Sequence, residues 1–226
     1  MAFDFQSEAN SYHQIEHGVR YPRYQAWEFL WEYLHDLGSF REAAAPDNIE
    51  QTALHLGFFL ANWGMLRGSS NLPNTNLAFF VDFVRQLDGH VPHAFWGLKF
   101  DDFRTEPARA GALFEKTVQV ITSFEGGDAA RISWTETLIT KILLGIWGQC
   151  PAIDSYYKIG FRLYTREHGL RLGPACNGRY LTRVAELAFK HSWPLAGFSS
   201  RRKGLPYPPG KVLDMAFFNY GVEHAP

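Results

Sequence analysis

The chain has 226 residues, enough for one large domain or two small ones with a proper hydrophobic core. Its two cysteines, Cys150 and Cys176, form no CxxC pair, which argues against both a secreted disulfide scaffold and a zinc site. Residues 1–130 hold nine Lys and Arg and 17 Asp and Glu, whereas residues 131–226 hold 13 and six. This asymmetry is typical of polyanion binding by the basic half, and equally of two halves that attract each other across an internal interface.

The start of the chain lacks the basic and apolar regions of a signal peptide, and we expect a cytoplasmic protein. The apolar helices are interrupted by Gly, Asn, Thr or Lys before they reach membrane-spanning length, so we expect no membrane partner. We expect residues 1–20 to form a loose arm. Residues 21–226 are then predicted to form a single domain, with an acidic half at 21–130 and a basic half at 131–226.

Helical periodicity dominates the sequence. Apolar residues recur at i, i+3, i+4 and i+7, and no segment shows the alternation of a strand or the turn of a β-hairpin. The pattern therefore predicts an all-α domain of about eight helices. In chain order, the predicted helices lie near 27–34, 47–63, 76–88, 107–123, 135–147, 154–165, 181–188 and 210–221, with clear loops at 170–176 and 194–210.

A first candidate binding segment runs from 61 to 71, where an amphipathic helix leads into a corner rich in Gly and Ser. Glycine lets a ligand approach the backbone, and exposed N–H and hydroxyl groups can hold a phosphate. An arginine at such a corner can grip an anion or a base edge. A helix C-cap followed by a turn is the ordinary alternative. The candidate substrate-binding residues of this segment are Asn62, Trp63, Arg67, Ser69 and Ser70.

The most informative segment joins two helices. The predicted helix 135–147 carries Lys141, and Asp154 begins the next helix, directly before Tyr156 and Tyr157. A carboxylate can stabilise the oxocarbenium-like state of a breaking glycosidic bond, and a desolvated lysine amine can attack the sugar carbon. Aspartate is also among the best N-cap residues, and a lysine stem can cover apolar surface, so both residues have a purely structural alternative.

The basic half offers further cations in loops rich in Ser, Gly and Pro. Such cations are natural phosphate contacts, although an ordinary solvated loop has the same composition. Asp214 is expected to be an ion-pair partner of Lys211 or of a nearby arginine rather than a catalytic residue. The nine histidines form no metal-binding motif, and we expect neither metal nor cofactor. The candidate phosphate contacts are Arg131, Lys158, Arg201, Arg202, Lys203 and Lys211.

The segment 133–157 resembles the catalytic corner of the helix-hairpin-helix DNA glycosylase superfamily. In that family a helix leads to a short apolar-Pro-apolar-Asp sequence that supplies the catalytic carboxylate, and here the match is residues 150–154, ending at Asp154. The resemblance implies a glycosylase-like helical architecture with a degenerate hairpin, because the usual Gly-Val-Gly core is missing and 125–128 is a weak substitute. In bifunctional members, the lysine that forms the Schiff base lies at the start of the helix. The corresponding position here is near Thr135, whereas Lys141 lies further along the helix, so the resemblance implies a monofunctional enzyme.

The resemblance also implies roles for the candidate residues. Asp154 would stabilise the sugar cation with water as the nucleophile, and Lys141 would position Asp154, contact a phosphate or be structural. The walls of a pocket for an extruded base would be formed by Trp63, Tyr156 and Tyr157. Asn62 and Arg67 would read its edge, and the partner would be DNA, bound by a monomer.

The chain is also similar to an uncharacterised bacterial family, and some bacterial glycosylases act on modified phage DNA, so antiviral defence is an expected setting. Two other functions remain open. The chain has the charge asymmetry of a non-enzymatic helical nucleic-acid-binding or regulatory protein, which would need no chemistry at Asp154. Its aromatic content of 16% also suits a small-molecule enzyme with an aromatic-lined helical pocket.

Overall fold

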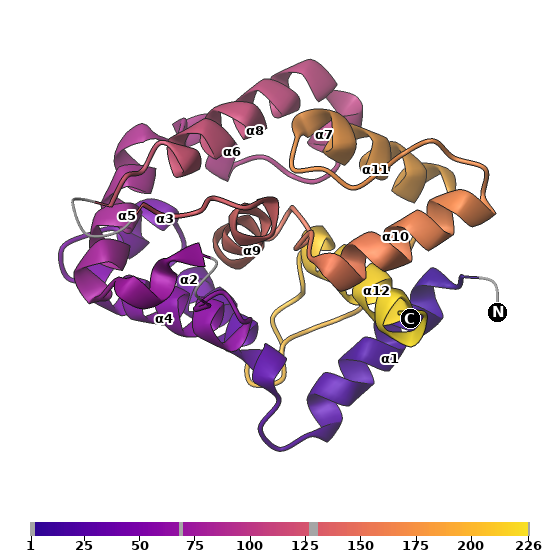
Figure 1. Ribbon diagram of the computed structural model, residues 1–226, viewed down its shortest axis with the longest axis horizontal. Coiled ribbons are helices and arrows are strands. Elements are labelled where there is room, and N and C mark those ends of the chain that lie inside the picture. Colours follow the sequence, from indigo (N-terminus) through magenta and orange to yellow (C-terminus); the bar gives the residue numbers. More distant parts are fainter. Residues whose placement is uncertain (1–2, 68–69, 127–130, 226) are drawn as a thin grey trace.

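The fold is built from helices alone across the residues that the structure describes. The computed structural model describes residues 3–67, 70–126 and 131–225, and within those ranges it holds twelve α-helices and no strand. Figure 1 shows α9 in the middle of the view, with the other helices around it. In chain order the elements are α1 (Phe5–Gly18), η1 (Arg23–Gln25), α2 (Ala26–Leu37), α3 (Phe40–Ala43), α4 (Ile49–Asn62), η3 (Leu72–Asn74), α5 (Leu77–His90), α6 (His93–Trp96), α7 (Asp102–Thr105), α8 (Pro107–Thr122), α9 (Glu136–Ile146), α10 (Ser155–Glu167), α11 (Gly178–Lys190) and α12 (Pro209–Glu223).

The predicted all-α class is confirmed, and the helix count is somewhat higher than predicted. The eight helices expected from the periodicity correspond to α2, α4, α5 and α8 to α12. Three of the additional helices, α3, α6 and α7, have only four residues each, too short to leave a periodic signal. The weak hairpin substitute at 125–128 falls partly outside the described residues.

The expected loose arm at the start of the chain is a helix, which corrects the prediction for residues 1–20. Asp4 caps α1 by accepting a hydrogen bond from the Ser7 backbone N–H at 2.9 Å. The buried stripe of α1 consists of Phe5, Ala9, Tyr12 and Glu16, and it packs against α12. An alanine and a glutamate in this stripe hide its periodicity from a pattern that counts only large apolar residues. Figure 1 shows α1 running beside α12.

Helix α9 forms the centre of the hydrophobic core. Thr135 caps its start by accepting a hydrogen bond from the Leu138 N–H, and every residue from 138 to 146 is buried. A helix that is apolar on all sides is typical of a core position. Lys141 is the exception in this run, because it is charged in water and yet only 6% exposed. A lysine is rarely so buried unless a partner compensates its charge.

Helices α10 and α12 cross at very close range, and the crossing brings the start of α10 beside α12. Two glycines make this approach possible. A Cβ added at Gly160 would lie 2.0 Å from the Phe217 carbonyl oxygen, and one at Gly221 would lie 1.9 Å from the Tyr156 carbonyl oxygen. Because both obstacles are backbone atoms, no side-chain adjustment could relieve the clash. The crossing therefore fixes the position of Asp154 relative to the residues of α12.

Candidate active site

A cavity of about 390 Å³ opens where α1, α9, α10 and α12 meet the loop that follows α4. Its volume is within the usual range for small-ligand sites, and it combines aromatic walls with a few convergent charged groups. Asp154, Lys141 and Arg67 all line it, although they are far apart in the sequence. The complete lining is Tyr12, Arg23, Tyr24, Trp63, Met65, Arg67, Thr137, Lys141, Asp154, Ser155, Tyr156, Asp214 and Phe218.

Asp154 is both a helix cap and a pocket residue. Its Oδ1 atom accepts a hydrogen bond from the Tyr157 N–H at 3.0 Å, which caps α10, and its Oδ2 atom lies 3.8 Å from the Lys141 Nζ. The side chain is 16% exposed. Burial raises the pKa of Asp154, while Lys141 and the backbone N–H of Tyr157 oppose that rise. Capping thus uses one carboxylate oxygen and leaves the other for the cavity.

Lys141 holds its amine among oxygen atoms inside the pocket. The Nζ atom donates a hydrogen bond to the Trp63 carbonyl oxygen at 2.8 Å and lies 5.7 Å from the centre of the Trp63 ring. Burial lowers the pKa of Lys141, and the nearby carboxylates of Asp154 and Asp214 act in the opposite direction. The amine is therefore oriented by the backbone at the end of α4 and placed beside the carboxylate of Asp154.

Asp214 also lines the cavity, a position that the sequence did not suggest. The residue is 2% exposed, and its Oδ2 atom lies 3.7 Å from the Lys211 Nζ, so the predicted pairing of the two residues is confirmed. Its Oδ1 atom has no hydrogen-bond partner among the described residues. Burial raises the pKa of Asp214 to about 7. The signal in the sequence was a pair of charges three residues apart in an otherwise apolar helix.

Lys211 cannot contact a phosphate as predicted, because it is completely buried. Its Nζ atom lies 3.8 Å from Glu16 Oε1 and 3.4 Å from the hydroxyl of Tyr12. The amine also lies 5.0 Å from the centre of the Trp63 ring. Proximity in the sequence to the exposed basic loop suggested a surface role, but Lys211 belongs to the first turn of α12, where it compensates buried carboxylates.

The remaining candidates for substrate binding divide between the cavity and the core. Arg67, Trp63 and Tyr156 line the pocket, and Arg67 and Asp154 share it. Asn62 instead donates a hydrogen bond to the Phe58 carbonyl one turn back on α4. The structure corrects two further predictions: Tyr157 is fully buried, with its hydroxyl 2.7 Å from that of Tyr180, and the Ser70 hydroxyl donates to the Met65 carbonyl within its own loop. Ser69 lies outside the described residues.

The sequence pattern did not identify most of the other residues that line the pocket. Tyr12, Arg23 and Tyr24 come from the first 25 residues, most of which were expected to be an arm, and Phe218 comes from α12. The Tyr24 carbonyl accepts a hydrogen bond from the Trp63 indole N–H at 3.2 Å, which joins this segment to the end of α4. A sequence signal existed in 20–24, where two arginines alternate with two tyrosines around a proline.

The basic loop is bound to acidic α2. Glu28 Oε1 accepts a hydrogen bond from the Arg201 backbone N–H at 3.0 Å, and Arg202 Nε lies 3.6 Å from Glu32 Oε2. Lys203 pairs with Asp36. Arg202 and Lys203 are therefore paired with carboxylates of α2, whereas the Arg201 guanidinium donates to the Val19 carbonyl. At this loop, the charge asymmetry of the sequence reflects attraction between its two halves.

The other two proposed phosphate contacts differ from each other. Lys158 forms an ion pair with Glu136 at 2.6 Å, whereas Arg131 is exposed. Across 3–67, 70–126 and 131–225, no group of three or more His, Cys, Asp or Glu side chains is arranged to hold a metal ion. Within the same ranges, no helix combines the length and the apolar character needed to cross a bilayer.

Comparisons with protein-family models, with curated proteins and with solved structures returned no match. The chemistry of the pocket is therefore the basis on which a function can be assigned.

Proposed function

We propose that the pocket hydrolyses the N-glycosidic bond of a damaged or modified base in DNA, as a monofunctional glycosylase. The observation that carries the proposal is that Asp154 shares one small cavity with Arg67, Lys141 and aromatic walls. A glycosidic bond breaks through a cationic sugar, and a fixed carboxylate in a site of low dielectric stabilises that charge. The cap hydrogen bond from Tyr157 pre-organises the carboxylate before substrate binds.

The roles follow from the contacts. Asp154 stabilises the sugar cation and orients the attacking water. Lys141 is held by the Trp63 carbonyl and lies 3.8 Å from Asp154, so it acts as a positioning residue that keeps the carboxylate ionised. Tyr24, Trp63 and Tyr156 offer faces on which a base can stack. Arg67 supplies the planar donor group that can read a base edge or hold a phosphate.

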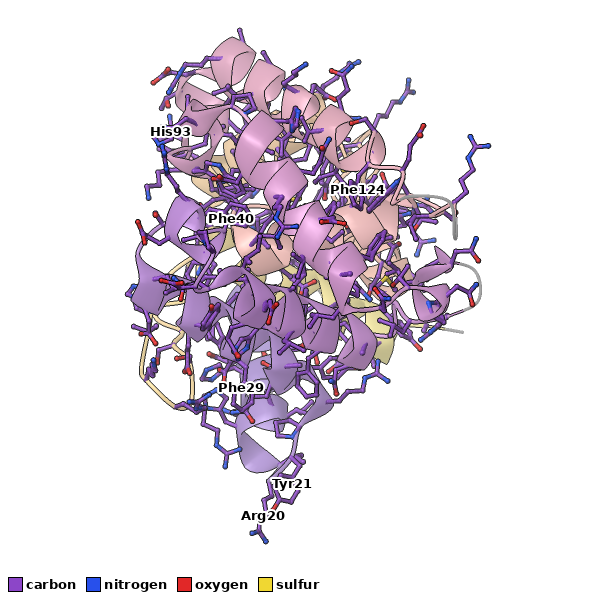
Figure 2. The ribbon with its side chains drawn as sticks, turned by 90° about the vertical axis from the view of Figure 1, so that its left-hand side faces the viewer. Arg20, Tyr21, Phe29, Phe40, His93 and Phe124 are labelled. Atoms are coloured by element: carbon purple, nitrogen blue, oxygen red, sulfur yellow. The ribbon has the colours of Figure 1, made fainter. Side chains whose placement is uncertain are left out.

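DNA contact is better assigned to residues 19–24 than to the loop at 201–203. Arg23 and Tyr24 line the cavity, and Arg20 and Tyr21 project from the end of the molecule (Figure 2). Tyr21 is 78% exposed, with the Arg20 guanidinium 5.0 Å from its ring centre. Cations alternating with aromatic rings are suited to phosphates and unstacked bases. Arg201 supports this segment through a hydrogen bond to the Val19 carbonyl at 2.8 Å.

A specific observation favours a second candidate, a hydrolase of small N-glycosides. Arg202 and Lys203 pair with α2, and Lys211 is buried, so these three predicted phosphate contacts are engaged within the protein. The cavity of about 390 Å³ suits a single small ligand. The catalytic roles of Asp154 and Lys141 would be the same for a free nucleoside. The two candidates differ only in whether residues 19–24 bind a strand.

The test is release of free base. Purified protein is incubated with a panel of modified and unmodified DNAs and with free nucleosides, and released bases are identified by mass spectrometry. Alkali cleavage at abasic sites reports the DNA products independently. Release from DNA by wild type and not by Asp154→Asn supports the glycosylase, and release from nucleosides alone supports the second candidate. Binding of DNA without any release would instead identify a non-enzymatic nucleic-acid-binding protein.

A further inference from the structure

A cluster of carboxylates and lysines lies at the inner wall of the pocket and behind it. Three acids, Glu16, Asp154 and Asp214, lie around two buried lysines, Lys141 and Lys211; Glu16 and Asp214 are buried, and the Asp154 side chain is 16% exposed. If every group were ionised, this cluster would carry one net negative charge, which is costly in a protein interior. Retaining one proton on a carboxyl makes the cluster neutral. The question is which carboxyl holds that proton and whether it can reach the cavity.

Asp214 is the carboxyl with both burial and access. It lines the cavity, whereas Glu16 is not part of the cavity lining. The Asp214 Oδ1 atom is buried without a hydrogen-bond partner among the described residues, so a proton there would not disrupt an existing bond. A protonated carboxyl is a hydrogen-bond donor, and the Asp214 side chain lines the cavity in which a ligand would bind.

The groups that face Asp214 come from four elements. Lys211 and Lys141 favour its ionised form, while Asp154 and Glu16 favour its protonated form. Tyr12, which is completely buried and stays neutral, contributes a hydroxyl beside Lys211. Burial is the largest influence and raises the pKa of Asp214 to about 7. Each aspartate lies beside a lysine, but of the two only Asp154 also accepts a backbone hydrogen bond within the described part of the chain, the α10 cap bond, which favours its ionised form.

We propose that Asp214 is a second catalytic residue, a general acid that protonates the departing base while Asp154 acts as the carboxylate. The inference rests on the proposed N-glycosidic hydrolysis, and it assigns opposite roles to two carboxyls of one pocket. Pairs of acids whose surroundings favour different protonation states are the usual way in which a site combines an acid and a base near neutral pH. Lys141 interacts with both carboxylates, each of which favours its charged form.

The step balances as a hydrolysis. The bond between the sugar C1′ and the base nitrogen breaks, and its electron pair goes to the base. Asp214 gives its proton to the base, which departs neutral, and a water oxygen bonds to C1′. Asp154 accepts the proton that the water loses. Exchange with solvent then returns a proton to Asp214 and removes one from Asp154, so the protein is unchanged overall.

The experiment has an activity arm and a titration arm. In the first, base release under single-turnover conditions is measured from pH 5 to 9 for wild type, Asp214→Asn and Glu16→Gln, with the DNA or nucleoside that wild type cleaves. Asp214→Asn should slow release by about 10²–10⁴-fold and abolish the decline of the rate at alkaline pH. Glu16→Gln, the control within the same ion cluster, should keep its maximal rate within about threefold and shift the decline to lower pH.

The titration arm needs no substrate. Carboxyl ¹³C NMR of the whole protein should show one aspartate that titrates near pH 7, that is missing in Asp214→Asn and that shifts to lower pH in Asp154→Asn. An Asp214 that titrates in the ordinary range near 4 overturns the inference. An Asp214→Asn enzyme whose rate and pH profile equal those of wild type also overturns the inference about Asp214. In that case the glycosylase proposal stands. If wild type cleaves nothing, the proposed function fails, and the titration alone decides whether the two carboxyls form an acid–base pair.

Discussion

Two regions of this protein bring carboxylates and cations together, and they do so in different ways. Where the loop containing 200–207 meets α2, Glu28 accepts hydrogen bonds from the Arg201 N–H, the Tyr207 hydroxyl and the Gln25 amide. In the charge cluster at the pocket, Asp214 Oδ1 and both carboxylate oxygens of Glu16, which lies behind the cavity lining, have no hydrogen-bond partner among the described residues. A carboxylate whose oxygens already accept hydrogen bonds from another segment holds the two segments together. A carboxylate oxygen without a hydrogen-bond partner can still accept a bond from a ligand or take up a proton.

Removing Glu28, the carboxylate that joins the loop to α2, should destabilise the protein more than any of the other substitutions. Glu28→Ala leaves three donors without an acceptor, two of them in the loop that packs on α2. Each orphaned donor costs about 1–3 kcal/mol, so the free energy of unfolding should fall by about 3 kcal/mol or more. Urea denaturation measures it. A loss below about 1 kcal/mol would show that the loop is not held by this residue.

Lys141→Met should separate activity from stability. Methionine keeps the apolar stem but removes the cation beside Asp154, so the pKa of Asp154 should rise further. We expect the rate of base release at pH 7 to fall by about 10–100-fold while the free energy of unfolding changes by less than about 1.5 kcal/mol. The decline of the rate on the acid side of the pH profile should move to higher pH. An unchanged profile would contradict the positioning role.

The stability of the protein should also depend on pH through Asp214. Its pKa is about 7 in the folded state against a reference value of 3.8, so between these values the folded protein binds more protons than the unfolded chain. Stability must therefore fall as pH rises from about 4 to about 7. On the order of 2 kcal/mol, or about 4–8 °C in melting temperature, should be lost between pH 5 and pH 8. Asp214→Asn should remove this dependence, and an equal slope in the variant would refute it.

The smallest effect concerns the surface. Tyr21→Ala removes an exposed ring at the end of the molecule, so stability should change by less than about 0.5 kcal/mol. Its affinity for a single-stranded oligonucleotide, measured by fluorescence anisotropy, should fall by about tenfold. Arg202→Ala, in the loop bound to α2, is the matched comparison and should stay within about twofold of wild type. Equal losses in both variants would assign DNA contact to both surfaces.

Much of the fold could be predicted because it depends on local pattern. Eight helices left the spacing of large apolar residues in the sequence, and the absence of alternation predicted the class. Helix α1 escaped because its buried stripe contains Ala9 and Glu16, whose burial depends on what α12 places opposite them. Spacing rules report large apolar side chains, and they say nothing of small or charged residues buried by a distant partner.

The site was predictable only where chemistry and local structure coincide. Asp154 and Lys141 could be found because a helix break directly precedes a carboxylate, and Arg67 because it follows a glycine-rich corner. Lys211 was misassigned, since a lysine next to an exposed loop reads as basic surface although it begins the buried α12. For Asp214, the sequence predicted only a role in an ion pair. Its role depends on Asp154 and Glu16, which come from other elements, and no local pattern reports such convergence.

If Asp154 performs chemistry beyond capping a helix, removing its charge while keeping its capping ability should abolish base release. Base release and DNA affinity are measured for wild type, Asp154→Asn and Asp4→Asn. Asparagine caps a helix about as well as aspartate, and Asp4 caps α1 outside the pocket lining, so Asp4→Asn is the matched control. We predict that Asp154→Asn binds DNA within about threefold of wild type but releases base at least about 10³-fold more slowly, whereas Asp4→Asn matches wild type in both. Release by Asp154→Asn at the wild-type rate would show that the carboxylate is only a cap.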